Sequence, residues 1–239
     1  MLESDNIKKY LIKLIVFICL LVGMFIWSYL PMELFHFNLD NASKMLKILY
    51  SLACDIGFMI VLYFGYKKTI NKNFKDYFKE FGKNFELSFK YYFIGLIIMF
   101  ISNLIINFFF TSAIAGNEET VRTYIDNYPL YMIFSVSLYA PFVEELIFRK
   151  SIKDLIMAGK KNNITRYIYI LISGLLFAYM HILGNVTNPI DYLYIVPYAS
   201  LGISFAALYS KTDNIFSTIT MHAMHNTFTI ILYLLIGGI

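Results

Sequence analysis

The sequence PFVEELIFRK, at residues 141–150, places two adjacent carboxylates and an arginine in an apolar context. The ten residues before it, 131–140, contain no charged side chain. Inside a lipid bilayer such charges are costly, and ionisable residues there usually mark a functional site with a specific partner. We therefore expect the rest of the chain to bring partners to Glu144, Glu145 and Arg149.

The composition indicates a membrane protein. Of the 239 residues, 59% are hydrophobic and only 15% are charged, and the mean hydropathy is +0.62. A soluble domain carries roughly 25% charged residues, so this chain has too few to cover a water-facing surface. The two cysteines, Cys19 and Cys54, lie in apolar runs and form neither a disulfide framework nor a CxxC metal motif.

Seven apolar runs of transmembrane length follow one another along the chain. They lie at about 10–30, 45–66, 91–112, from 128 to the polar cluster 160–163, 165–184, 191–209 and 214–236. Because proline is disruptive inside a helix, we expect a break at Pro141 that leaves 128–139 as a separate short helix. The sequence therefore predicts an all-α, polytopic transmembrane helical bundle of about seven to eight spans. The first run lacks a small-x-small cleavage site, so we expect an uncleaved first span.

Lysines suggest how the chain is oriented. Residues 67–90 alternate lysines with aromatic residues, which is typical of a basic amphipathic helix on an anionic membrane face. Nucleic-acid binding is the less favoured interpretation, and we predict no nucleic-acid partner. If the spans alternate, the lysines near the N-terminus, in 67–90 and in 150–166 fall on one side, so the positive-inside rule predicts a cytoplasmic N-terminus. We divide the chain into N-terminal transmembrane helices, residues 1–127, and a C-terminal helical core, residues 128–239, which contains the charged stretch.

Three histidines lie in apolar runs, while His36 lies in a polar link. One histidine in a helix is usually a hydrogen-bonded core residue, but three beside a carboxylate pair favour a common site. Glu144 and His181 lie about equally far from the turn at Asn162, so they are expected at similar depth. His222 lies only about eight residues past Asn214, so its expected depth fits less well.

Helical geometry separates the two glutamates. Glu145 and Arg149 are four residues apart and share a face, so we interpret them as a supporting ion pair. Glu144 points about 100° away from Glu145, so we interpret it as the reactive carboxylate that faces His181. His222 and Asn226 also share a face, and we rank His225 second to them.

These side chains suit amide hydrolysis. A glutamate beside a neutral imidazole can take a proton from water. A second histidine and an asparagine amide can donate hydrogen bonds to a tetrahedral oxyanion. The same glutamate and histidines, Glu144, His181 and His222, are also suited to hold a divalent metal such as zinc, and this alternative stays open.

Three motifs resemble those of the CPBP family, which comprises type II CAAX-processing proteases and bacteriocin-processing or self-immunity proteins. They are EExxxR at 144–149, FxxxH at 177–181 and HxxxN at 222–226, and the resemblance covers about residues 130–235. It implies an intramembrane endopeptidase in which Glu144 is the general base and His181 orients the water. It also implies that His222 and Asn226 lie on the oxyanion side, and we expect Phe177 to pack beside His181 and shield the site.

The favoured function is therefore an endopeptidase that cleaves a membrane-associated protein or peptide precursor. The bias toward Lys, Ile, Asn, Phe and Tyr suggests a bacterial source, which favours peptide maturation or bacteriocin self-immunity over processing of prenylated proteins. A non-catalytic membrane adaptor on the same scaffold is the alternative. A proton-coupled transporter is a third interpretation, but the sequence shows no inverted repeat. The sequence makes no prediction of oligomeric state.

Overall fold

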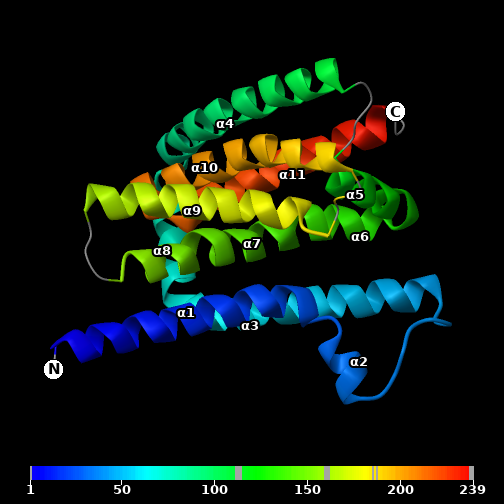
Figure 1. Ribbon diagram of the computed structural model, residues 1–239. Helices are drawn as coiled ribbons and strands as arrows, with labels where there is room; N and C mark the ends of the chain where they lie inside the picture. Colours follow the sequence, from blue (N-terminus) through cyan, green and yellow to red (C-terminus); the bar gives the residue numbers. More distant parts are fainter. Residues whose placement is uncertain (1, 111–114, 159–161, 185, 187, 237–239) are drawn as a thin grey trace.

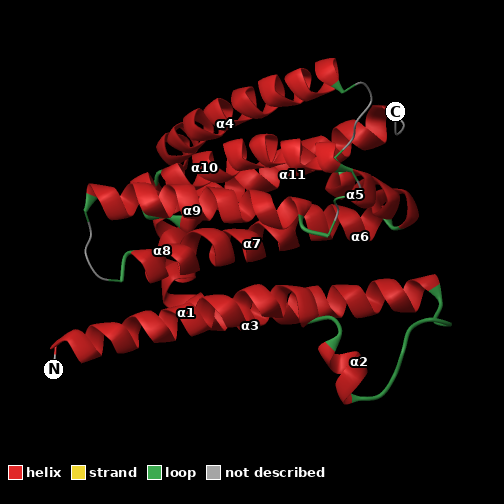
Figure 2. Ribbon diagram, in the orientation of Figure 1, coloured by secondary structure: helices red, strands yellow, loops and turns green. Residues whose placement is uncertain are grey.

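The computed structural model describes residues 2–110, 115–158, 162–184, 186 and 188–236, and these residues form helices and no strands (Figures 1 and 2). The first long helices are α1 (Leu2–Ile26), α3 (Lys44–Lys79) and α4 (Phe81–Phe109), and the short helix α2 (Leu30–Leu34) follows α1. The remaining elements are α5 (Gly116–Asn127), α6 (Pro129–Phe134), η1 (Ser135–Tyr139), α7 (Ala140–Glu144), η2 (Glu145–Ser151), α8 (Ile152–Ile156), α9 (Asn163–Ile182), η3 (Pro189–Tyr194), α10 (Ile195–Thr212) and α11 (Ile215–Ile236).

Within the described residues, seven helical segments are long and apolar enough to cross a membrane. They are Ile7–Ile26, Lys44–Lys79, Phe81–Phe109, Pro129–Ile156, Asn163–Ile182, Pro189–Thr212 and Ile215–Ile236. The predicted all-α, polytopic helical bundle is therefore confirmed.

The span from α6 to α8 lies between the other helices. Figure 1 shows α1 and α3 side by side along one edge, and α4 along the opposite edge. Trp27, which follows α1, contacts α3. Its Nε1 donates a hydrogen bond of 2.8 Å to the carbonyl of Cys54, and its ring centroid lies 5.4 Å from that of Phe58. The largest buried cluster includes Leu146, Ile147 and residues of α1, α3, α9 and α10. The charged stretch 141–150 is thus at the centre of the bundle.

The predicted break at Pro141 is wrong. The chain stays helical from Pro129 to Ile156, and two π-helical segments, η1 and η2, lie on either side of α7. In η1 the N–H of Ala140 donates to the carbonyl of Ser135, five residues back. This wider turn leaves room for the proline ring, which would otherwise clash with the carbonyl four residues before it.

The prediction that residues 67–90 form one amphipathic helix is also wrong, because these residues are divided between the end of α3 and the start of α4. Helix α3 continues to Lys79 with a kink at Tyr66, where φ is −115° and ψ is 16°. The chain then turns at Glu80 into α4. Figure 1 shows the cyan segment after the kink crossing the left-hand end of the bundle. The amphipathic pattern itself is present, because Ile70, Asn73 and Tyr77 are buried on one face.

Helices α9 and α10 approach closely at two glycines. A Cβ atom added to Gly174 would lie 2.4 Å from Cγ1 of Ile203 and 2.7 Å from its backbone nitrogen. A Cβ atom on Gly202 would lie 2.7 Å from the carbonyl oxygen of Gly174. Small residues allow such contacts between transmembrane helices, and here they let α9, which carries His181, pack closely against α10.

Lys160 and Lys161, in the polar cluster that precedes α9, lie outside the described residues.

Candidate active site

Glu145 and Arg149 form an ion pair inside the bundle. The Nε atom of Arg149 lies 3.0 Å from Oε2 of Glu145, and neither side chain is accessible to solvent. Arg149 also donates to the carbonyl and hydroxyl of Ser173, at 3.4 and 3.3 Å. The predicted contact of Glu145 with Arg149 is therefore present within η2, and the hydrogen bonds from Arg149 to Ser173 join η2 to α9.

Glu144 faces two histidines. Its Oε2 atom lies 4.0 Å from Nε2 of His181 and 3.8 Å from Nε2 of His222. This oxygen is buried and has no direct hydrogen-bond partner. The three side chains come from α7, α9 and α11. The structure therefore brings together one ionisable residue from each of the three motifs.

The other ring nitrogen of each histidine is engaged. Nδ1 of His181 lies 2.9 Å from the carbonyl oxygen of Phe177, and Nδ1 of His222 lies 3.0 Å from Oε1 of Glu145. A carbonyl or an ionised carboxylate only accepts hydrogen bonds, so each Nδ1 carries a proton. In the neutral imidazoles the lone pair is then on Nε2, the atom that faces Glu144. Such partners on the far side of a histidine fix its orientation.

Phe177 packs against both histidines and the arginine. Its ring centroid lies 4.3 Å from that of His181 and 5.7 Å from that of His222. The guanidinium carbon of Arg149 lies 4.5 Å from the Phe177 centroid, which is a cation–π distance. Only 3% of Phe177 is exposed. This apolar contact covers one side of the cluster, as a shielding role requires.

The depth of His222 differs from what residue counts suggest, because the helix ends are staggered. At about 1.5 Å per residue, Glu144 lies about 18 Å from the end of α8 and His181 about 27 Å from the start of α9. His222 lies only about 10 Å from the start of α11. Figure 1 shows α9 extending beyond the end of α8. Distance from a turn therefore does not measure depth here, and the expected mismatch does not keep His222 from Glu144.

Asn226 and His225 make other contacts. The amide nitrogen of Asn226 donates to the carbonyl of Val136 at 2.9 Å. An amide group has a second N–H, so a role as an oxyanion donor stays a prediction. Nδ1 of His225 lies 3.2 Å from the hydroxyl of Tyr92 on α4. His225 is thus turned away from the glutamates, in agreement with its lower rank.

Glu144, His181 and His222 are the side chains that the sequence indicates as suited to a divalent metal. Among the described residues, no group of three His, Cys, Asp or Glu side chains is arranged to hold a metal ion. Glu144, His181 and His222 are not such a group in this structure. We therefore derive no step through a metal.

Sequence reasoning missed two groups near these helices. Asp55 is a carboxylate within the second span, and the hydroxyl of Tyr131 donates to it at 3.0 Å. A single acidic residue in the apolar run 49–64 was the available signal. The ring of Tyr198 lies 4.8 Å from that of His181, and no pattern in the sequence indicated this contact.

Fold and site together define a polytopic membrane protein with a buried glutamate–histidine cluster. Residues 126–228 match the family described as "Type II CAAX prenyl endopeptidase Rce1-like". The matched segment contains all three motifs, which carry the paired glutamates and the site histidines.

Curated bacterial proteins are also similar to this chain. The protein called "Putative membrane peptidase YdiL" of Bacillus subtilis is 28% identical over 82% of this chain and 75% of its own length. "Membrane-embedded CAAX protease MroQ" of Staphylococcus aureus is 30% identical over 59% of this chain and 57% of its own length. A third relative, YvdC of Lactococcus lactis, is 25% identical over 60% of this chain and 52% of its own length. No solved structure matches the chain.

These findings confirm the resemblance seen in the motifs. Over residues 126–228 the chain is similar to the CPBP family of type II CAAX endopeptidases, and one of the matching relatives is named as a membrane-embedded CAAX protease.

Proposed function

We propose that the protein is an intramembrane endopeptidase in which Glu144 activates a water molecule for attack on a peptide bond. The observation that carries this proposal is the position of the buried Oε2 atom of Glu144, within 4.0 Å of the Nε2 atoms of both His181 and His222. A water molecule in front of these three atoms can pass a proton to the carboxylate while an imidazole nitrogen orients it.

The proposed reaction conserves protons and electrons. Glu144 takes one proton from water, and the resulting hydroxide adds to the scissile carbonyl carbon, giving a tetrahedral oxyanion. The carbon–nitrogen bond then breaks, and the proton held by Glu144 goes to the leaving amine. A carboxylic acid and an amine are the products.

His222 and Asn226 are proposed to stabilise the oxyanion. This role requires a second proton on His222, at Nε2, in place of the lone pair of the neutral ring, and the adjacent carboxylate of Glu145 would compensate the added charge. Hydrogen-bond donors fixed in advance toward a developing oxyanion typically raise the rate about 10²- to 10³-fold each. His181 is held by the Phe177 carbonyl, which suits it to orient the water.

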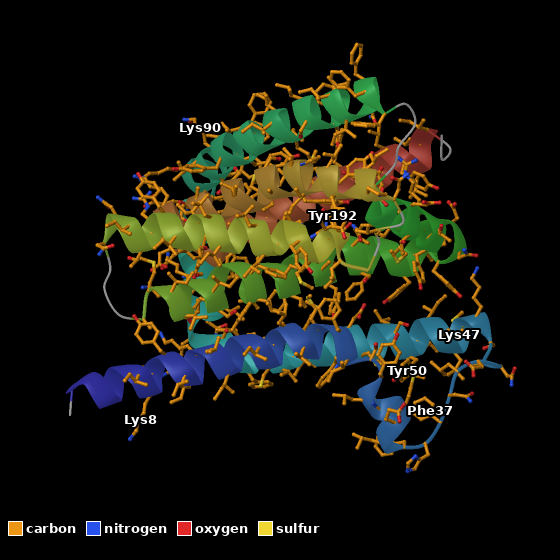
Figure 3. All side chains as sticks on the ribbon, in the orientation of Figure 1. Lys8, Phe37, Lys47, Tyr50, Lys90 and Tyr192 are labelled. Atoms are coloured by element: carbon orange, nitrogen blue, oxygen red, sulfur yellow. The ribbon has the colours of Figure 1, made fainter. Side chains whose placement is uncertain are left out.

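We infer that the substrate is a membrane-associated protein or a peptide precursor, because the cluster lies within spans that are embedded in lipid. Similarity to bacterial membrane peptidases supports a multi-pass protein of a bacterial cell membrane. The N-terminus is proposed to be cytoplasmic, since Lys8 and Lys90 lie toward the same end of the bundle and Lys47 lies toward the other (Figure 3). Peptide maturation and bacteriocin self-immunity are the favoured biological roles.

The test compares single variants in membranes that contain the native substrate. Glu144→Ala and His181→Ala are expected to abolish cleavage, while each protein still inserts and folds. Glu86→Ala is the matched control, because Glu86 is an exposed carboxylate whose ion pair is with the exposed Lys90, at 2.6 Å. Full cleavage by Glu144→Ala would contradict the assigned mechanism. Activity in the presence of a chelator, with the metal content of the purified protein measured in parallel, tests whether the glutamate and histidines suffice.

The alternative is an adaptor that binds a partner without cleaving it. A cell-based complementation assay separates the two functions. The endopeptidase proposal expects that Glu144→Ala does not restore function to cells that lack the wild-type protein. Full rescue by this variant would favour the adaptor.

A further inference from the structure

One end of the bundle carries a concentrated positive charge. Residues 67–90, called here the basic hairpin, form the last part of α3 and the first part of α4. They contain seven lysines and three acidic residues, so their net charge of +4 equals that of the whole chain. All seven lysines are exposed: Lys67, Lys68, Lys72, Lys75, Lys79, Lys83 and Lys90.

The basic hairpin is seated on the bundle rather than extended as a free loop. Asn84 donates from its amide to the carbonyl of Tyr77 at 2.9 Å, which closes the turn. The buried side chain of Asn73 accepts a hydrogen bond of 2.9 Å from the backbone N–H of Ile215, and the Asn73 carbonyl accepts one from Asn214. The hairpin therefore holds the start of α11, the helix that carries His222. Its lysines consequently have a fixed arrangement relative to the spans.

Aromatic rings run along the same hairpin. Phe74 and Phe78 lie 4.6 Å apart, and Phe78 and Phe81 are stacked at 5.8 Å. The row continues through Phe85 and Phe89, at 5.4 and 6.2 Å between successive rings. Phe74, Phe78 and Phe81 are each about half exposed, at 50%, 46% and 45%. Exposed phenyl rings between exposed lysines are suited to neither bulk water nor the hydrocarbon core, but to the boundary between them.

We propose that the basic hairpin is a binding surface for the headgroups of anionic phospholipids. The phenyl rings enter the boundary between headgroups and acyl chains, and the lysine stems extend past them so that the ammonium groups reach the phosphates. The crossing segment after Tyr66 begins where a membrane span ends, so lipid headgroups lie at this level on all sides. Charge complementarity selects an anionic headgroup over a zwitterionic one.

The placement of the rings favours lipid over nucleic acid. Bases stack on aromatic side chains in a solvated groove, whereas these rings adjoin membrane-spanning helices on both sides of the turn. The surface also differs from the glutamate–histidine cluster in location and chemistry. The proposal therefore does not depend on peptidase activity.

The test measures lipid binding by the full chain in a neutral detergent. Phosphatidylglycerol and phosphatidylcholine are titrated separately, and bound lipid is counted by native mass spectrometry. Phosphatidylglycerol is expected to bind at least about tenfold more tightly, since each lysine near an anionic surface contributes up to about fivefold. Raising the salt concentration from about 0.1 to 0.5 M should weaken this binding, because exposed charges are screened.

Two variants that remove the same charge localise the effect. K68Q/K72Q/K75Q/K79Q is expected to weaken phosphatidylglycerol binding at least about tenfold, at an unchanged Tm. K8Q/K9Q/K44Q/K47Q, the control, removes the same charge outside the hairpin, and it should weaken the binding clearly less than the hairpin variant does. The corresponding Lys→Arg variant of the hairpin keeps the charge and should keep binding.

Three outcomes would overturn the proposal. They are equal binding of the two lipids, equal weakening by the hairpin and control variants, and binding of a single-stranded DNA oligonucleotide without a preference for phosphatidylglycerol. Because no cleavage is measured, a negative result leaves the endopeptidase proposal unaffected.

Discussion

The Nδ1 atom of His222 lies 3.0 Å from Oε1 of Glu145. The carboxylate that pairs with Arg149 therefore also orients the histidine whose Nε2 faces Glu144, at 3.8 Å. The two adjacent glutamates thus contact the same imidazole through different nitrogens. Glu145 has a larger part in the site than charge balance with Arg149, since its removal would leave His222 without the group that fixes its ring.

His222 and His225 offer a matched comparison on one helix. His222→Ala is expected to lower cleavage at least about 100-fold, because it removes a proposed oxyanion donor next to Glu144. His225→Ala removes a contact with Tyr92 and should change cleavage by no more than a few-fold. Cleavage rates and Tm are measured for both variants in the same detergent. An equal loss of activity in the two would contradict the role assigned to His222.

The ion pair of Glu145 and Arg149 should stabilise the fold only as an intact pair. Arg149→Met leaves an uncompensated buried carboxylate and is expected to cost about 3–5 kcal/mol in the free energy of unfolding. Glu145→Leu leaves Arg149 unpaired and should cost a similar amount. The double variant Glu145→Leu/Arg149→Met removes both charges and should be more stable than either single variant. Denaturation in detergent measures all three, and additive losses would show that the two residues are not coupled.

The motifs predicted most contacts of the candidate site because they combine rare intramembrane charges with helical spacing. The contact of Glu145 with Arg149 follows from their separation of four residues, which places two side chains on one helix face. The meeting of Glu144 with His222 depends on how far each helix protrudes, and spacing within one helix carries no such information. The contact of the Tyr198 ring with His181 likewise depends on tertiary packing.

Pro141 is a position where the sequence pattern predicts the wrong backbone structure. A proline in a long apolar run predicts a break from its missing N–H and its ring. The chain instead keeps the helix by widening it in η1, which hydrophobic spacing over a few residues does not reveal. The turn at Glu80 is similar, because the lysine-rich amphipathic spacing continues through it and conceals where α3 ends.

A variant of Asn226 can distinguish a catalytic role of this residue from a role in helix packing alone. Asn226→Ala is expected to lower the turnover rate about 10²- to 10³-fold if its second amide N–H binds the oxyanion. Loss of the hydrogen bond to the Val136 carbonyl should lower the free energy of unfolding by only about 1 kcal/mol. Turnover rate and Tm are therefore measured on the same preparations. Unchanged turnover with a lowered Tm would show that Asn226 only joins α11 to η1.

A side chain added at Gly174 should disrupt the close contact between α9 and α10. Gly174→Ala places a methyl group where Ile203 already lies, at 2.4 Å from its Cγ1, so the helices must separate. Overpacking of this kind typically costs about 1–3 kcal/mol, and the displaced α9 should also move His181 away from Glu144 and lower cleavage. Gly65→Ala is the control, because among the described residues an added Cβ there meets no packing neighbour within 4 Å and alanine favours helix more than glycine. A Gly174→Ala variant with the Tm and cleavage rate of wild type would contradict this account of how α9 holds His181 in place.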